Sequence, residues 1–212
     1  AETAAEKLFR WRDKDKDGTL TKDDLPEQAQ QTFDKRDADK NGLLTKEEET
    51  AFRLGAIRQI AAKKAHMERM KPPPVTHADV SYGDHEKQRF DIWLAEAATP
   101  TPLAIYIHGG GFSGGDKKSV NGPLVGKLLA KGISFASFNY RLTDVGPYPM
   151  QMLDCARALQ YVRYHAADYH IDPRRIGLMG GSAGSGISQW LAFHEDLAET
   201  DSTDPVARES TR

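Results

Sequence analysis

Two short glycine-rich motifs place a serine where it could act as a nucleophile. Residues 108–112 read His-Gly-Gly-Gly-Phe after one apolar run, and residues 180–184 read Gly-Gly-Ser-Ala-Gly after another. The second motif has the G-x-S-x-G spacing of a tight strand-to-helix turn that exposes its serine, and the first is typical of a loop that supplies oxyanion donors. Either motif alone marks only a turn, but the two in this order indicate acyl transfer by Ser182.

The first fifty residues contain an internal repeat with an offset of 24 residues. Residues 13–18 and 37–42 both follow the pattern D-x-[DN]-x-[DN]-G, in which alternate oxygen-bearing side chains converge on one hard cation and the glycine takes a positive φ. The alternative interpretation is a pair of aspartate-rich surface turns that bind nothing. Because the two copies stand in register, we predict two calcium sites of EF-hand type.

The predicted calcium ligands occupy alternate positions of each loop. The first loop would use Asp13, Asp15, Asp17, the Thr19 carbonyl, Thr21 through a water molecule, and Asp24, and the second would use Asp37, Asp39, Asn41, the Leu43 carbonyl, Thr45 and Glu48. Glu48 has the reach for bidentate binding, whereas Asp24 is one methylene shorter, so we expect the second site to be the more regular. Leu20 should pair with Leu44 across the two loops.

The two loops lie close together in the sequence. Only residues 25–36 separate them, which is enough for one shared helix of about three turns. This spacing resembles that of the compact calcium-binding doublets of bacterial secreted proteins, so we expect a structural role rather than a switch. Phe9 and Phe33 should pack from the helices that enter the loops. A further helix is predicted over residues 46–70, and the three prolines at 72–74 end it.

Beyond residue 75 the pattern alternates between strands and helices. Strands are predicted at 79–82, 88–94, 103–108, 133–139 and 176–179, and helices at 123–131, 149–169 and 182–197. This alternation predicts an α/β fold, with a mostly parallel sheet that is covered by helices on both faces. The chain thus divides into an all-α calcium-binding doublet (1–55), a helical and proline-rich linker (56–75) and an α/β domain (76–212).

Residues 79–199 resemble the N-terminal part of an α/β-hydrolase, strands one to five. The similar group is that of hormone-sensitive-lipase-like carboxylesterases and bacterial carbohydrate esterases. The matching segments are the two glycine motifs, Asp79-Val80-Ser81-Tyr82-Gly83, Gly115-Asp116-Lys117, Asn139-Tyr140-Arg141-Leu142, and Ile171-Asp172-Pro173 with Arg175-Ile176. The resemblance implies a serine esterase whose oxyanion is bound by the N–H of Ala183, helped by those of Gly110 and Gly111.

Three residues near these motifs have two interpretations. Phe112, Tyr140 and Asp144 lie on loops above the predicted sheet. They could line the acyl or alcohol pocket of the implied esterase. Packing of the rings or capping of the loops is an equally good interpretation.

The implied triad has no evident acid or base in this chain. In the resembling fold the order is serine, acid, histidine, with the last two after later strands. His194 is the only histidine after Ser182, and a single helix of this length would place it about 18 Å away, so it cannot be the base. The implied strand order 1-2-4-3-5-6-7-8 would also leave strand 176–179 as an apolar edge. We therefore expect the acid and histidine outside this chain, and a complementary chain or oligomer partner over that edge.

Composition limits the classes of partner. The net charge of −2, from 29 basic and 31 acidic residues, gives no overall field for nucleic acid, and no apolar stretch is long enough to span a membrane. The start at Ala1-Glu2-Thr3 suits a secreted or periplasmic protein that has lost its signal peptide, although trimming of the chain explains it equally well.

These observations combine into one functional prediction with one alternative. We predict a secreted serine esterase, stabilised by calcium, that hydrolyses carboxylic or carbohydrate esters through an acyl-enzyme, with this chain alone expected to be inactive. The alternative is a noncatalytic calcium-binding module on a degenerate or incomplete hydrolase scaffold.

Overall fold

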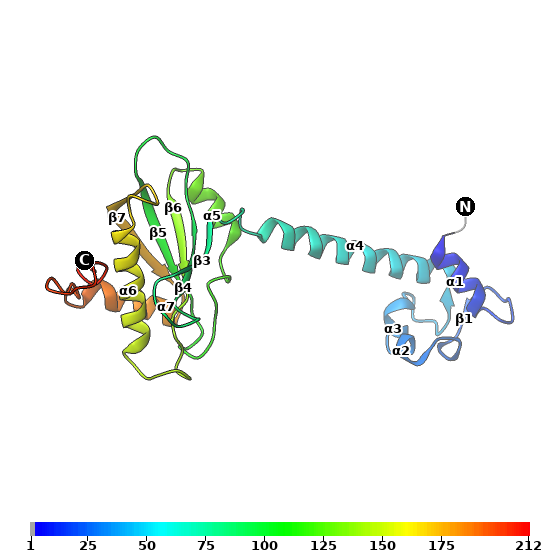
Figure 1. Cartoon of the computed structure of the whole chain (residues 1–212). Helices are drawn as coiled ribbons and strands as arrows, with labels where there is room; N and C mark the ends of the chain where they lie inside the picture. The colour runs from blue at the N-terminus through cyan, green and yellow to red at the C-terminus, as the bar shows by residue number, and fades with distance from the viewer. Residues whose placement is uncertain (1–2) are drawn as a thin grey trace. The chain divides into compact units, whose positions relative to one another are not determined.

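The computed structural model describes residues 3–212, apart from the side chain of Ala5, and divides the chain into two compact units, Ala1–Glu68 and Arg69–Arg212 (Figure 1). Ala1 and Glu2, on which the predicted location depends, lie outside the described residues. Of the helices within residues 3–212, none combines the length and the apolar content needed to cross a bilayer.

The first unit is built from short helices around a two-stranded ribbon. Its elements are α1 (Ala4–Arg12), β1 (Thr19–Leu20), the 3-10 helix η1 (Lys22–Asp24), α2 (Glu27–Gln30), α3 (Phe33–Arg36), β2 (Leu44–Thr45) and α4 (Lys46–Met70). A capping box between Thr3 and Glu6 starts α1, because each residue's side chain satisfies the other's backbone N–H. The helix predicted over residues 46–70 is confirmed as α4.

The core of the first unit follows the predicted repeat. β1 and β2 are antiparallel, and Leu20 faces Leu44 with both side chains fully buried. Phe9 and Phe33 pack against this pair, as predicted. The single helix predicted over residues 25–36 is wrong, since α2 and α3 are separate helices. The Thr32 hydroxyl donates to the Ala29 carbonyl at this break, an alternative to continued helix that threonine offers the backbone.

A buried carboxylate ties α1, α3 and α4 together. Glu49 is 1% exposed and lies 2.8 Å from Arg36 Nη1, 2.6 Å from Arg53 Nε and 3.8 Å from Arg12 Nη1. Burial, together with the charge of Arg53, lowers the pKa of Arg12. Because a buried charge that loses its partner is costly, this cluster fixes how the three helices meet.

The second unit contains a five-stranded sheet in the order β3-β4-β6-β5-β7. Its elements are β3 (His77–Ser81), β4 (Arg89–Trp93), β5 (Thr101–Ile107), α5 (Gly122–Leu129), β6 (Ser134–Phe138), α6 (Met150–Tyr164), β7 (Ile171–Gly180) and α7 (Ala183–Phe193). This order confirms the predicted 1-2-4-3-5 arrangement. The prediction of a mostly parallel sheet is only partly correct, because β5 is parallel to β6 and β7 whereas β4 is antiparallel to both of its neighbours.

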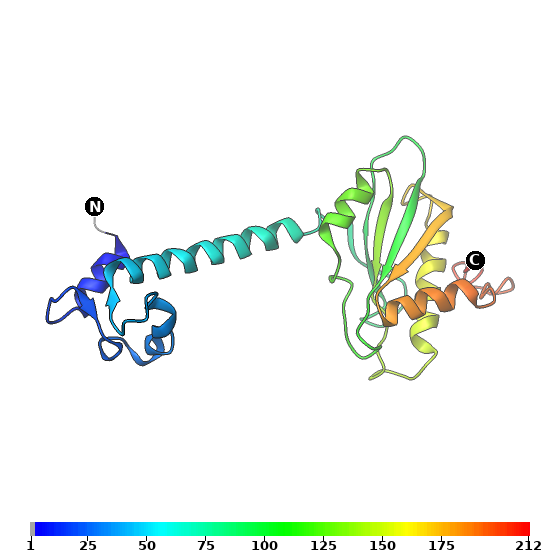
Figure 2. The same cartoon turned by 180° about the vertical axis from the view of Figure 1, so that it is seen from behind.

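Helices cover both faces of this sheet (Figures 1 and 2). α6 and α7 pack on the face that carries Phe90, Ile105 and Phe138, and α5 packs on the face that carries Trp93 and Phe135. Successive residues of each strand face opposite sides of the sheet, and apolar residues on both sides contact helices. The predicted cover of both faces by helices is therefore confirmed. Three boundaries differ from the prediction by four residues or more. α6 ends at Tyr164 rather than at 169, and α7 ends at Phe193 rather than at 197. β7 begins at Ile171, which pairs with Thr101 of β5, rather than at 176.

β7 has a neighbour on one side only among residues 3–212. It pairs with β5, and no other described strand adjoins it. Its apolar residues Ile176, Leu178 and Met179 are only partly buried. An edge of this kind offers unpaired backbone groups to a further strand.

Candidate active site

The turn after β7 presents Ser182 in a strained conformation. β7 ends at Gly180, α7 begins at Ala183, and Ser182 between them has φ 52° and ψ −118°. A positive φ is uncommon for a residue that is not glycine and often marks a functional site. The Ser182 side chain is exposed, so the turn directs it away from the core.

Two glycines allow the chain to bend this sharply. A Cβ at Gly184 would collide with the carbonyls of Ile107 and His108, so α7 approaches the end of β5 at a distance that only glycine permits. A Cβ at Gly180 would likewise collide with the backbone of Gly184 and the Ile107 carbonyl. The close contact of β7, α7 and β5 therefore requires glycine at positions 180 and 184, on either side of Ser182.

The structure brings the first glycine motif against this turn. A Cβ at Gly109 would lie 2.6 Å from the Gly181 carbonyl oxygen and 3.4 Å from Ser182 Cβ. Gly110 and Gly111 have φ of 122° and 60°, the left-handed region in which side chains are disfavoured. Two segments far apart in the sequence thus meet at the carboxyl ends of β5 and β7.

Three backbone N–H groups remain available around Ser182. Within residues 3–212, those of Gly110, Gly111 and Ala183 donate to no other group. Ala183 is the first residue of α7, where N–H groups have no partner inside the helix and the helix dipole favours negative charge. The assignment of these donors to an oxyanion stays a prediction, and the geometry leaves them free for that role.

A buried lysine anchors the glycine loop to the sheet. Lys117 is 2% exposed, and its Nζ lies 2.6 Å from Asp91 Oδ1 on β4 and 2.8 Å from Asp79 Oδ1 on β3. Its backbone N–H donates to Asn139 Oδ1 (2.6 Å), and its carbonyl accepts from Ser137 Oγ (2.7 Å). Three strands therefore hold the C-terminal end of the loop that begins at residue 108.

The charged forms of Lys117 and of Asp79 stabilise each other. Burial alone would lower the pKa of Lys117, but its hydrogen bonds and ion pairs with Asp79 and Asp91 outweigh burial and raise that pKa. The Lys117 side chain in turn lowers the pKa of Asp79. In the sequence, Lys117 stands out only as part of the family resemblance, because the contacts of its ammonium group join residues that are distant in the chain.

The other end of the loop rests on a ring stack. The His108 ring lies 4.4 Å from that of Tyr140 with an interplanar angle of 14°, and the Tyr140 hydroxyl donates to the His108 carbonyl (2.9 Å). Burial lowers the pKa of His108, which favours the neutral ring. Because the Tyr140 side chain is fully buried, its interpretation as a pocket wall is wrong and the packing interpretation holds. Phe112 packs partly against the core, and Asp144 is exposed.

His194, predicted to be unsuitable as a base, and His165 both lie away from Ser182. His194 follows the last residue of α7, at the opposite end of that helix, and stacks on Trp190 with 4.0 Å between ring centroids. His165 precedes β7 and pairs with Asp168 (2.8 Å). Among residues 3–212 no hydrogen bond to Ser182 Oγ is formed.

The first unit brings together six of the predicted calcium ligands in two groups. In each group the carboxylate oxygens of three residues lie within 4.8 Å of one another. The first group consists of Asp13, Asp15 and Asp17, and the second of Asp37, Asp39 and Glu48. Asp24 is not in the first group. Its carboxylate accepts from the Thr21 N–H and hydroxyl (2.8 and 2.7 Å), as that of Glu48 does from Thr45 (2.9 and 2.8 Å). The Asn41 amide oxygen accepts from the Leu43 N–H (2.8 Å).

These two groups fit a hard cation. Asp13 Oδ1 is buried and has no hydrogen-bond partner within residues 3–212, which is costly unless a ligand satisfies it. Three carboxylates this close repel one another, and oxygen donors of this kind suit Ca²⁺. Gly18 (φ 87°) and Gly42 (φ 83°) occupy the sixth loop positions, where the repeat requires a positive φ.

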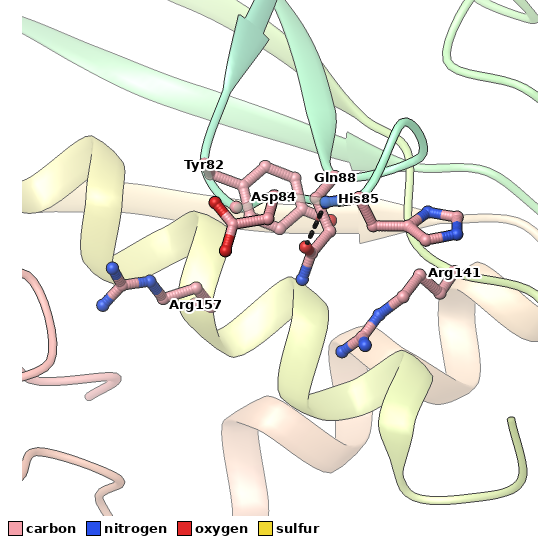
Figure 3. A pocket seen from close by; sticks show the side chains of 7 residues that line it. Tyr82, Asp84, His85, Gln88, Arg141 and Arg157 are labelled. Carbon is pink, nitrogen blue, oxygen red and sulfur yellow. Dashed lines mark hydrogen bonds between the residues drawn. The ribbon is translucent and has the colours of Figure 1, made fainter. Parts of the chain in front are cut away.

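A polar pocket that the sequence did not reveal lies at the end of the β3–β4 hairpin (Figure 3). It has a volume of about 580 Å³. Its labelled lining residues are Tyr82, Asp84, His85, Gln88, Arg141 and Arg157. The sequence predicted only the two strands, 79–82 and 88–94, that flank one wall of the pocket, because the opposite wall comes from α6 and the segment after β6.

Comparison with known proteins identifies the family. The model of the BD-FAE family matches residues 90–211, which is more than half of the chain and covers both glycine motifs. The chain belongs to the BD-FAE family. The residues that match the BD-FAE model, 90–211, include Ser182, the glycine loop and Lys117, which anchors that loop.

Individual relatives of this BD-FAE member are esterases. Esterase LipQ of Mycobacterium tuberculosis is 30% identical over 120 residues, which are 55% of this chain and 28% of LipQ. The structure of an acetyl ester-xyloside bifunctional hydrolase from Caldicellulosiruptor lactoaceticus is similar with a TM-score of 0.53 and 32% identity, over 58% of this chain and 45% of that chain. A truncated carbohydrate esterase from gut microbiota gives a TM-score of 0.58 and 26% identity, over 67% and 56% of the two chains.

The matched region covers only part of the proteins compared. This chain spans 28% of the length of LipQ and 31% of the length of Carboxylesterase NlhH of Mycobacterium tuberculosis. The relatives therefore have more residues than this chain matches.

Proposed function

We propose that Ser182 is the nucleophile of a serine esterase that acts on carboxylic esters, including acyl esters of carbohydrates. The observation that carries this proposal is the strained turn at Ser182, packed against a glycine loop with free N–H groups. Membership of the BD-FAE family and the esterase names of its relatives support it.

The chemistry proposed for the site has two steps. Ser182 Oγ attacks the acyl carbon, and the N–H groups of Ala183, Gly110 and Gly111 bind the resulting oxyanion until the alcohol leaves with a proton. Water then attacks the acyl-enzyme, so that the carboxylic acid departs and the serine hydroxyl is restored. Loss of one oxyanion donor typically costs about 10²–10³-fold in rate.

We propose that the general base and its acidic partner belong to residues outside this chain. The Ser182 proton needs an acceptor within hydrogen-bond reach, and His194 and His165 lie elsewhere in the second unit. A later strand could join the open edge of β7 and carry such residues to the Ser182 end of the sheet.

The test is hydrolysis of p-nitrophenyl acetate by this 212-residue chain and by the longest natural polypeptide that contains it. We expect turnover by the longer polypeptide and little or none by the shorter. Absence of turnover in both would contradict the esterase proposal and favour the noncatalytic calcium-binding module.

We also propose that the first unit binds two calcium ions in loops of EF-hand type, and that this stabilises the unit. Asp13, Asp15 and Asp17 would hold one ion, helped by the Thr19 carbonyl and Asp24. Asp37, Asp39, Asn41, the Leu43 carbonyl and Glu48 would hold the other. The unsatisfied Asp13 Oδ1 and the two carboxylate groups support the proposal.

Calcium should raise the melting temperature of the first unit. At a calcium concentration of 100 Kd, each site would add about 2.7 kcal/mol to the free energy of unfolding, which in so small a unit corresponds to about 10 °C or more. The fluorescence of the exposed Trp11 in α1 reports this unit. Asp37→Asn should remove the contribution of the second site, about half of the shift, whereas Asp34→Asn, which changes an exposed aspartate on α3, should retain all of it. An unchanged melting temperature in calcium would contradict the proposal.

A further inference from the structure

The pocket at the β3–β4 hairpin has rigid walls. Arg89 Nη1 donates to the carbonyls of Gly83 (3.1 Å) and His85 (3.3 Å), which fixes the turn between the two strands. Gln88 accepts from the His85 N–H (3.1 Å) and donates to Asp154 Oδ1 on α6 (2.9 Å), so it joins the turn to the helix below. A pocket held in this way needs little ordering when a ligand binds.

The charges of the pocket disfavour an anionic ligand. Arg141 is paired with the buried Asp154 and Arg157 with Asp204, both at 2.6 Å. Asp84 is exposed, and its carboxylate has no partner among residues 3–212. Since each guanidinium is already neutralised, the one unpaired charge in the pocket is negative and would repel a carboxylate or phosphate.

The same walls disfavour an apolar ligand and suit a neutral one with many hydroxyl groups. Tyr82 is 2% exposed and its hydroxyl donates to the Asn139 carbonyl, so it offers no open ring face. In Figure 3, Asp84 and Arg157 lie at one end of the pocket and His85 and Arg141 at the other. Carboxylate oxygens accept and guanidinium groups donate, and hydroxyl groups do both. The volume of about 580 Å³ is within the range of small-molecule sites.

The pocket opens at the same end of the sheet as Ser182. Asn139 follows β6 and donates its N–H to the Arg89 carbonyl (2.9 Å), so the hairpin adjoins the carboxyl end of β6. Ile107 pairs with Phe138 and with Gly180, which puts the ends of β5, β6 and β7 in one row. β4 and β3 stand three and four strand spacings from β7, so with about 4.8 Å per strand the hairpin pocket lies about 14–19 Å to the side of the serine turn.

We propose that this pocket binds a saccharide unit of the alcohol part of the ester, a few sugar residues away from the acylated hydroxyl. The inference rests on the proposed esterase function of Ser182 and adds a binding site for the sugar part of a carbohydrate ester. Because the phenol ring of Tyr82 is buried, hydrogen bonds provide most of the attraction for the sugar, and binding is weak.

The test is calorimetric titration of the 212-residue chain with xylotetraose, a neutral probe chosen because one similar structure is an acetyl ester-xyloside hydrolase. We expect saturable binding at millimolar concentration. Asp84→Ala and Arg157→Ala should each weaken binding about fivefold, since each removes hydrogen-bonding groups from the pocket. The controls Glu86→Ala, an exposed acid of the same turn, and Arg174→Ala, an exposed arginine of β7, should leave it unchanged.

Three outcomes would overturn the inference. They are no saturable binding of xylotetraose, equal binding by the Asp84→Ala and Arg157→Ala variants and the controls, or tighter binding of glucuronate than of the neutral sugar. Hydrolysis of p-nitrophenyl acetate, which carries no sugar, separates this result from the function of Ser182. Turnover of that ester without xylotetraose binding would remove the sugar site and leave the esterase in place.

Discussion

Ser182→Ala should reduce ester hydrolysis by about 10⁴-fold or more, because no other group can take the place of a serine nucleophile. The assay is turnover of p-nitrophenyl acetate by the longest natural polypeptide that contains this chain. Since Ser182 is exposed and its Oγ bonds to no described residue, the free energy of unfolding should change by less than about 0.5 kcal/mol.

The matched control is Ser185→Ala, one turn further along α7. This variant keeps the nucleophile and should retain the rate of the unmodified protein within a few-fold. Loss of activity in Ser185→Ala with retention in Ser182→Ala would show that the nucleophile is a different serine.

Lys117→Met should destabilise the second unit by about 3–5 kcal/mol, because it leaves the buried Asp91 carboxylate without its ammonium partner. The change should also lower the rate of ester hydrolysis by about tenfold or more, since the glycine loop loses its anchor beside Ser182. Urea unfolding followed by the fluorescence of Trp93, which is buried in the second unit, measures the first effect.

Lys118→Met is the matched control, because this neighbouring lysine is exposed. It should shift the free energy of unfolding by less than about 0.5 kcal/mol. The double variant Lys117→Met with Asp91→Leu should recover much of the lost stability, since an apolar pair can replace a buried ion pair. Equal stability of the Lys117→Met and Lys118→Met variants would show that the ion pair does not anchor the loop.

Much of the fold could be predicted where short-range patterns decide it. The alternating strands and helices of the second unit predicted its α/β fold, and the strand order was implied by the family resemblance. Met152, Leu159 and Val162 of α6 are buried as the helical spacing requires. The repeat in the first unit predicted the facing of Leu20 and Leu44. In each case apolar residues recur at a fixed interval in the sequence, so they have to lie on the same buried face.

The rest depended on contacts between distant segments. Tyr140 is a plausible pocket residue until the ring of His108 is placed against it. The ion pairs of Lys117 join the loop after β5 to β3 and β4, and nothing near Lys117 in the sequence indicates them. The hairpin pocket needs Asp154 of α6 to hold Gln88, a contact between residues 66 positions apart. Such sites follow from tertiary packing rather than local pattern.

The measurement that tests the central claim most directly is covalent labelling of the active polypeptide with diethyl p-nitrophenyl phosphate. Attack by a serine oxygen on phosphorus releases p-nitrophenol and leaves a diethylphosphoryl group on that serine. Tryptic digestion gives the peptide 176–208, which also contains Ser185, Ser188 and Ser202. The account predicts one label on Ser182 and loss of hydrolysis in proportion to it. A label on another serine, or inactivation with Ser182 unmodified, would contradict it.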